Sequence, residues 1–433
     1  MTRTLLTGAD LVLPDRIAAN HTLVIEDGRI VEMSSGLRTV ASGEHRMDLS
    51  GHVIVPGFID VHVHGVLGRD VQDGDGAIAA IARDMPRFGV TAFCPTTVAC
   101  SPETLATVLA EVQRLRATPE PGAARVLPAH LESNFISPAF NGAQPIDCLR
   151  KPPARWTPDS TDRTRTRTWT WTGTGTRTRT QDPGRLRTRD PEPGTRDFTA
   201  EAVLSVLFSH RPDVSIVTMA PELEHGMDLV RTLVAAGLIV SMGHSGANYE
   251  QSLEAIAAGA RHATHLFNRM TPLSHRDPGM VGAVLSTDDV AAELLADGHH
   301  VHPSVMRVAI AAKSASRVMA ISDGTAGAGL PRGAKAKLGG RTITVEDVAR
   351  LDDRTMAGSV LTMDRAFACL VGPVGAGLID AARMCATTPA AELGLQGHGV
   401  LAVGATADLA VLDANLAVRQ TWIGGRCGFD ART

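Results

Sequence analysis

The sequence predicts an α/β protein, a (β/α)8 barrel with a small β-sandwich domain formed from both chain termini. Three observations support this fold class. The chain has 433 residues, which is enough for a barrel of about 250 residues and a smaller companion. Strand-like apolar runs alternate with amphipathic helical segments through the middle of the chain, as in parallel sheets with crossover helices. Both chain ends have instead the pattern of short strands joined by turns.

The small β domain is predicted over residues 1–55 and 398–433. Short apolar runs alternate there with turns rich in Gly and Asp, and Asp27-Gly28 is a typical hairpin signal. No long amphipathic segment interrupts either region. We therefore expect the two chain ends to assemble into one β-rich unit beside the barrel.

The barrel is predicted over residues 56–397. The segments 102–117 and 249–260 have the apolar periodicity of amphipathic helices. Eight apolar runs are candidate strands, the number that a closed barrel requires. They cover residues 53–64, 89–96, 124–132, 214–222, 238–245, 262–267, 290–298 and 317–324.

A segment at about 151–197 interrupts the barrel pattern. Thr, Arg, Pro, Asp and Gly dominate it, and every second residue from Thr164 to Thr180 is Thr. Because it has no aliphatic face to bury, we expect a disordered or poorly packed insertion. Its basic residues and the two tryptophans interleaved in the Thr repeat would suit weak polyanion binding. A repetitive DNA tract or a local reading-frame error is the other origin that we consider.

The composition is that of an ordinary soluble protein. The chain is 44% apolar and 20% charged with a net charge of −4, which indicates neither a nucleic-acid nor a membrane partner. It has no apolar run of about 18 residues and no signal-peptide pattern at its start, so we expect a cytoplasmic protein. The six cysteines form no C-x-x-C pair, which argues against a thiolate metal site.

Two histidines at the end of the first candidate barrel strand suggest a metal site. His62 and His64 are two residues apart, so their side chains point to the same side of the strand. An isolated pair of this kind is as often a pair of hydrogen-bonded structural histidines. The metal interpretation gains weight because four more candidate ligands end other strand-like runs: Glu132, His244, His265 and Asp323.

Residues far apart in sequence can meet in this fold, because the carboxyl ends of all barrel strands converge on one mouth. Histidine and carboxylate ligands without thiolates, with room left for water, are typical of a catalytic rather than a structural metal site. The sequence therefore predicts a catalytic metal site at the mouth of the barrel.

Several motifs resemble one known family. Residues 56–65 (PGFIDVHVHG), 243–247 (GHSGA), 263–268 (ATHLFN), 296–303 (ADGHHVHP) and 321–329 (ISDGTAGAG) are similar, in order, to motifs of the N-acetylglucosamine-6-phosphate deacetylases. The similarity continues through HRDPG, MAGSVLTMD and TTPAAELGL and covers nearly everything outside 151–197. It implies hydrolysis of the N-acetyl group of N-acetyl-D-glucosamine 6-phosphate by a homodimer.

The resemblance also implies roles for individual residues. Glu132, His244 and His265 would bind the principal divalent metal, and His62 and His64 a second ion. The metal would be zinc, with iron, cobalt or manganese as alternatives. Asp323 would be the general acid and base. The remaining positions would hold the phosphosugar: Ala143, Asn268, Arg269, Arg276, His300, Met356, Ala357 and Gly358.

This chain departs from the family pattern at three places. In the loop after Glu132, Ser133-Asn134 stand where Gly-Pro is common and Gln144 where a His is common. The pocket loop could therefore be reshaped. Arg269 replaces a small residue, and its side chain could add an ionic contact or crowd the pocket. The 111 residues between Glu132 and His244 exceed what the barrel units need, and the excess coincides with the segment 151–197. Two alternatives stay open at this point: a deacetylase of another N-acyl amino sugar, such as N-acetylgalactosamine 6-phosphate, and a catalytically silent scaffold or polyanion-binding protein.

Overall fold

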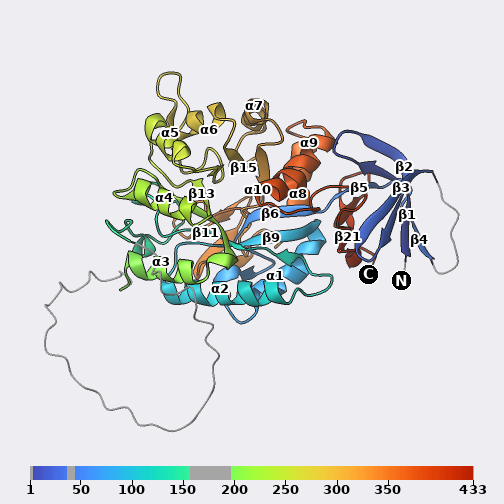
Figure 1. Cartoon of the computed structure of the whole chain (residues 1–433), viewed down its shortest axis with the longest axis horizontal. Helices are drawn as coiled ribbons and strands as arrows, with labels where there is room; N and C mark the ends of the chain where they lie inside the picture. The colour runs from blue at the N-terminus through green and yellow to red at the C-terminus, as the bar shows by residue number, and fades with distance from the viewer. Residues whose placement is uncertain (1–2, 37–43, 157–196, 433) are drawn as a thin grey trace, which may run out of the picture.

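The computed structural model describes residues 3–36, 44–156 and 197–432. Parallel strands form a barrel in the middle of the molecule, helices surround it, and a separate sheet lies at one end (Figure 1). This arrangement confirms the predicted fold class. Residues 157–196 lie outside the described part, so the expectation of a poorly packed insertion stays a prediction.

Eight parallel strands form the barrel, and each of the eight candidate runs contributes one of them. Their order around the barrel follows the chain, and the bounds are β6 (Phe58–Val63), β9 (Val90–Thr97), β11 (Ala129–Glu132), β12 (Val214–Met219), β13 (Ile239–Met242), β14 (His262–Ala263), β15 (Ala291–Leu295) and β16 (Val318–Ile321). A short piece, β10 (Arg125–Val126), precedes β11 and also pairs with β9.

The barrel closes between its first and last strands. The N–H of Asp323 donates to the carbonyl of His62 at 2.9 Å, and the N–H of His64 donates to the carbonyl of Gly324 at 2.8 Å. A parallel bridge also joins Val63 and Gly324. The seam thus places the predicted histidine pair directly beside the predicted catalytic aspartate.

Each barrel strand is followed by a helix among the described residues. Ser101 caps the longest of these helices by accepting from the N–H of Thr104, with Pro102 at its first position. The predicted helix over 102–117 is confirmed, and the one over 249–260 ends three residues early. The bounds are α1 (Ala77–Asp84), α2 (Pro102–Ala117), α3 (Ala200–Ser209), α4 (Gly226–Ala235), α5 (Tyr249–Ala257), α6 (Gly279–Ser286), α7 (Pro303–Lys313), α8 (Met363–Val371), α9 (Leu378–Ala382) and α10 (Thr388–Glu392).

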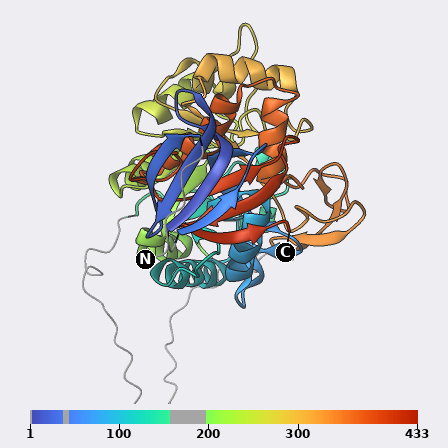
Figure 2. The ribbon, with the colours of Figure 1, turned by 90° about the vertical axis from the view of Figure 1, so that its right-hand side faces the viewer.

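Strands from both chain ends share one sheet, which Figure 2 views face-on. β20 pairs antiparallel with β5, and this pairing joins the C-terminal strands to the N-terminal ones. A separate apolar core lies against the sheet. The strands are β1 (Arg3–Val12), β2 (Ile17–Glu26), β3 (Arg29–Ser35), β4 (Glu44–Asp48), β5 (Val53–Pro56), β20 (Leu409–Leu412), β21 (Val418–Ile423) and β22 (Arg426–Asp430).

The apolar run 53–64 was expected as one strand, but the structure divides it at Gly57. β5 belongs to the terminal sheet and β6 to the barrel. A Cβ at Gly57 would lie 2.2 Å from the Cγ2 of Thr91, so only glycine lets the chain pass there. We keep 1–55 with 398–433, and 56–397, as proposed domain boundaries.

A three-stranded antiparallel sheet after β16 was not predicted. It consists of β17 (Lys335–Leu338), β18 (Arg341–Val345) and β19 (Ala349–Arg350). Near the other end of the barrel sequence, β7 (Gly65–Val66) and β8 (Arg69–Asp70) form a short hairpin. Within the described ranges, no helix is long and apolar enough to cross a membrane.

Candidate active site

A cavity of about 430 Å³ opens where the barrel strands end. Its floor contains the carboxylates and imidazoles that the sequence predicted. Five of the predicted metal and catalytic residues line it, and His62 lies directly behind them. The cavity-lining members are His64, Glu132, His244, His265 and Asp323.

Glu132, His244 and His265 form the first cluster. Oε1 of Glu132 lies 2.7 Å from Nε2 of His244 and 3.0 Å from Nε2 of His265. The two imidazole Nε2 atoms are 3.1 Å apart. These three residues come from β11 and from the segments after β13 and β14, so strand convergence has brought them together as predicted.

His62 and His64 form the second cluster, with their Nε2 atoms 3.2 Å apart. Oε2 of Glu132 lies 3.5 Å from Nε2 of His64. Oδ1 of Asp323 lies 3.3 Å from the same nitrogen and 3.6 Å from Nε2 of His62. Glu132 therefore turns one carboxylate oxygen toward each histidine pair.

Hydrogen bonds on the far side of the rings fix the histidine tautomers. Nδ1 of His62 faces Oε2 of Glu293 at 2.9 Å, Nδ1 of His64 faces the carbonyl of Thr96 at 3.1 Å, and Nδ1 of His244 faces the carbonyl of Phe140 at 2.7 Å. Because all three acceptors are oxygens, each Nδ1 carries the hydrogen. In a neutral ring, the form that binds a metal, each Nε2 then presents a lone pair to the cavity.

Converging lone pairs of this kind fit a divalent cation. Two ligands bound tetrahedrally at about 2.0–2.1 Å are about 3.3 Å apart, close to the separations of both histidine pairs. The nitrogen and carboxylate donor set also suits such an ion, and the same groups stand out as metal-binding clusters. The residues present therefore fit the metal that the resemblance implies.

Backbone conformation aims three of these side chains. His244, His265 and Asp323 have φ values of 47°, 29° and 45°. Each lies two residues beyond the end of its strand. Left-handed backbone is unfavourable for residues with a Cβ and is concentrated at functional sites. The same turn at three strand ends directs three side chains into one mouth.

The two acids of the site are held in their ionised form. Burial raises the pKa of Glu132, but His244, His265 and His62 outweigh it and hold that pKa well below its ordinary value. The pKa of Asp323 is likewise lowered by neighbouring histidines against the effect of burial. Both carboxylates are thus available as a ligand or a base near neutral pH.

Sequence reasoning missed a buried glutamate behind the site. Glu293 lies in the middle of β15 and is fully buried. Its Oε2 also accepts from the backbone N–H of His265 at 3.2 Å. Burial lowers the pKa of His62, but Glu293 outweighs this and, with Asp323 and Glu132, raises it to about 10. The signal available in the sequence was a charged residue inside an otherwise apolar strand.

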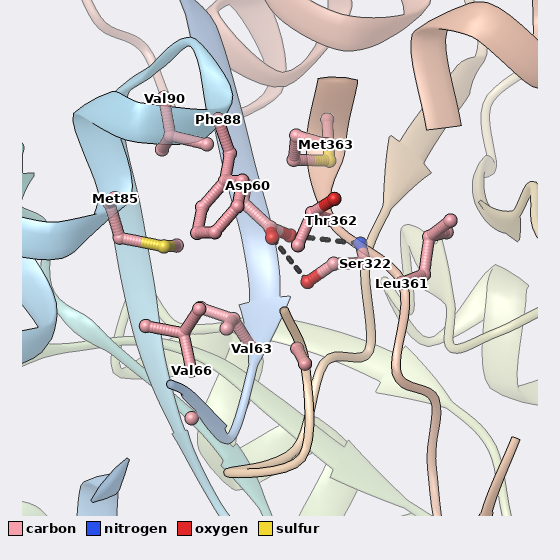
Figure 3. Close-up of a pocket in the computed structure, with 12 residues that line it drawn as sticks. Asp60, Val63, Val66, Met85, Phe88, Val90, Ser322, Leu361, Thr362 and Met363 are labelled. Carbon is pink, nitrogen blue, oxygen red and sulfur yellow. Dashed lines mark hydrogen bonds between the residues drawn. The ribbon is translucent and has the colours of Figure 1, made fainter. Parts of the chain in front are cut away.

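Asp60 lies two residues before His62 in the same motif, and the structure places it at the barrel seam. Figure 3 shows it pointing from β6 toward Ser322, whose hydroxyl and backbone N–H both donate to it. Apolar side chains such as Phe88 and Met363 surround the pair. Burial raises the pKa of Asp60 to about 6. The contact with Asp60 thus fixes Ser322, the residue before Asp323.

Most of the predicted sugar-binding residues line the same cavity. These are Ala143, Asn268, Arg269, His300, Met356 and Gly358. His300 is oriented by Asp297, whose Oδ2 lies 2.6 Å from its Nδ1. Two predicted residues are not part of the lining. Ala357 is buried in a separate apolar cluster, and Arg276 is exposed on the segment between β14 and α6.

Two of the departures from the family pattern have structural partners. The Ser133 hydroxyl donates to the carbonyl of Thr218 at 2.6 Å, and the Asn134 amide donates to two backbone carbonyls at 2.8 Å. Both are buried. Gln144 does line the cavity, and its Nε2 donates to Oε2 of Glu132. The loop that contains Gln144 therefore contacts the predicted metal ligand directly.

Comparisons with known proteins agree with this geometry. The profile of the Amidohydrolase family matches residues 53–428. The N-acetylglucosamine-6-phosphate deacetylase of Lysinibacillus sphaericus is 31% identical over 404 residues, covering 93% of this chain and 92% of that protein. The human protein of the same name is 32% identical over 403 residues, covering 90% and 86%.

Solved structures of deacetylases with the same name are similar to this chain over nearly its whole length. A mutant N-acetyl-D-glucosamine-6-phosphate deacetylase from Mycobacterium smegmatis, in complex with N-acetyl-D-glucosamine-6-phosphate, superposes with a TM-score of 0.80 at 28% identity and covers 99% of this chain and 100% of that one. The Thermotoga maritima deacetylase has a TM-score of 0.76 at 26% identity, with coverage of 99% and 100%.

The barrel, the buried histidine and carboxylate cluster and these matches define a member of the amidohydrolase family, a hydrolase that acts on an amide bond. Relatives at or above 30% identity cover nearly the whole chain. Within that family, the chain belongs to the N-acetylglucosamine-6-phosphate deacetylases.

Proposed function

We propose that the protein hydrolyses the N-acetyl group of N-acetyl-D-glucosamine 6-phosphate, giving glucosamine 6-phosphate and acetate in amino-sugar catabolism. The observation that carries this proposal is the convergence of Glu132, His244 and His265 at the floor of a cavity that Asn268 and His300 also line. Relatives with this activity in their names span nearly the whole chain, and one structural neighbour holds this sugar phosphate.

The cofactor that we propose is a divalent metal, with zinc as the first choice and iron, cobalt or manganese also suited to these donors. Glu132, His244 and His265 would bind the principal ion, and His62 and His64 a second one. Such an ion would polarise the acetamide carbonyl and lower the pKa of a bound water to about 7.

Asp323 is the proposed general base and acid. Its carboxylate is ionised and lies at the cavity floor beside His64. It would take a proton from the attacking water as the new C–O bond forms. It would then give that proton to the sugar nitrogen as the C–N bond breaks, so that one carboxylate serves both steps.

The sugar phosphate would be held by groups that line the cavity. We propose Asn268, His300, the backbone at Arg269 and at Ala143, and the loop of Met356, Ala357 and Gly358.

Arg276 does not line the cavity of its own chain, so its proposed role in binding the sugar phosphate requires a second copy. We therefore propose a homodimer together with that role. The cytoplasm is the compartment that we propose.

Acetate release measured on purified protein tests this function. We expect turnover of N-acetyl-D-glucosamine 6-phosphate that is abolished by a chelator and restored by a divalent metal. The His244→Ala variant should lose both metal content and activity. Equal turnover of N-acetylgalactosamine 6-phosphate would extend the proposed substrate range to that epimer. Wild-type protein that is metal-free and inactive would overturn the proposal.

A further inference from the structure

Arg269 is the feature of the cavity that the metal chemistry leaves unexplained. It follows Asn268 in the turn after β14, has a left-handed backbone with φ 51°, and is exposed at the cavity wall. Its carbonyl accepts from the N–H of Ser245 at 3.0 Å, which fixes the backbone. The side chain therefore starts from a defined position at the rim of the site.

The opposite loop makes room for this side chain. A Cβ at Gly142 would lie 2.9 Å from Nε of Arg269 and 3.4 Å from its Cδ. Gly142 also has a left-handed backbone, with φ 59°. The arginine stem thus lies across the loop that carries Ala143 and Gln144, and a larger residue at position 142 would displace it.

Charge is the second observation. Arg269 is the only lysine or arginine among the residues that line the cavity, counting the described part of the chain. Among the described residues, no carboxylate forms an ion pair with the Arg269 guanidinium. The acids of the cavity, Glu132 and Asp323, are buried among the histidines at the floor. A permanent cation without a protein counter-ion is therefore presented to whatever fills the outer cavity.

We propose that the guanidinium of Arg269 binds the phosphate of the substrate from within the same subunit and sets the preference for a phosphorylated sugar. This inference rests on the proposed function. A planar guanidinium offers paired N–H donors to phosphate oxygens. Because Arg269 belongs to the chain that holds the metal site, phosphate recognition does not depend wholly on Arg276 of a second copy.

The test compares Arg269→Ala and Arg269→Lys with a matched control. Arg261→Ala removes the same charge from an exposed residue at the other end of β14, outside the cavity. For the phosphorylated sugar we expect Arg269→Ala to raise KM by about 10- to 100-fold while kcat stays within about 2-fold, because the contact is equal in ground and transition states. Arg269→Lys should be intermediate, and Arg261→Ala unchanged.

The unphosphorylated sugar supplies the control for structural damage. Its kcat/KM should be the same in wild type and Arg269→Ala. Titration calorimetry with inorganic phosphate measures the contact without turnover, and Arg269→Ala should bind phosphate at least about 10-fold more weakly. Equal phosphate affinity in the two proteins would overturn the inference, even if wild type proves to be an active deacetylase. Inactive wild type with an intact phosphate difference would overturn the proposed function alone.

Discussion

Replacing Glu293 by Gln should weaken both the fold and the metal site. Oε2 of Glu293 accepts from His62 at 2.9 Å and from the backbone N–H of His265 at 3.2 Å. Burial raises the pKa of Glu293, but His62 and His130 outweigh it and lower that pKa, so the group is ionised near neutral pH. Glutamine has the same shape but lacks the charge that strengthens these bonds.

The size of the effect follows from these contacts. Hydrogen bonds to a charged group contribute about 1.5–3 kcal/mol each, against about 1 kcal/mol for neutral pairs. The new amide nitrogen would occupy the place of Oε1, which accepts no hydrogen bond among the described residues and lies 3.8 Å from Nδ1 of His130. His130 cannot accept from it there, because its Nδ1–H already donates to the carbonyl of Val61 at 3.0 Å. We expect a loss of about 3 kcal/mol in the free energy of unfolding.

Metal affinity should fall as well. Partners of a metal-binding histidine fix its tautomer, and losing one costs about 10- to 100-fold in affinity. Competition with a chromogenic chelator measures this, and urea unfolding of the metal-free protein measures stability. Glu201→Gln, an exposed position in the first turn of α3, is the matched control. Unchanged affinity and stability in Glu293→Gln would refute the reasoning, and a loss of stability alone would make the residue purely structural.

Three further predictions follow from other contacts. Asp323→Asn should lower kcat by about 100- to 10,000-fold with metal content retained, measured by acetate release and metal analysis; a kcat near wild type would remove the residue from catalysis. Gln144→Leu should lower metal affinity by about 10-fold in chelator competition, because Glu132, the proposed metal ligand, loses a hydrogen-bond donor; equal affinity would contradict this. Burial raises the pKa of Asp408, but His398 and Arg125 hold it below its ordinary value. The stability that this provides is present above the unfolded pKa and is lost as pH falls through the lowered folded pKa. Asp408→Asn should therefore cost about 3 kcal/mol near neutral pH and about 1 kcal/mol less at about pH 3 by urea unfolding, and a pH-independent difference would contradict the assignment.

The barrel could be predicted because its strands are buried on both faces. Strands such as β9 and β15 are buried at every position, so they appear in the sequence as short continuous apolar runs. The division of the run 53–64 was not visible in the same way. It depends on the closeness of Gly57 to Thr91, two residues that only the folded chain brings together. The sheet β17–β19 was missed because its strands are short and half exposed.

The residues at the strand ends could be predicted as site residues because the topology of the barrel brings those ends together. Residues at strand ends such as Glu132 and His244 meet because the ends of all parallel strands face one mouth. Glu293 could not be found by this rule, because it lies within its strand and not at the end. The left-handed turns that aim His265 and Asp323 could not be located from the sequence either. His and Asp adopt that backbone more often than most residues with a Cβ, but at too few of their positions to predict it.

The departures from the family pattern are connected across the cavity. Gln144 can stand where a histidine is common because the N–H of Ala99 donates to its Oε1 at 2.8 Å, which forces the amide nitrogen toward Glu132. Two residues earlier in the same loop, Gly142 leaves the space that the Arg269 side chain occupies. One loop thus contacts the proposed metal ligand Glu132 on one side and Arg269, the proposed phosphate-binding residue, on the other. A substitution of Gly142 should consequently disturb the KM for the phosphorylated sugar, whereas a substitution of Gln144 should disturb metal affinity.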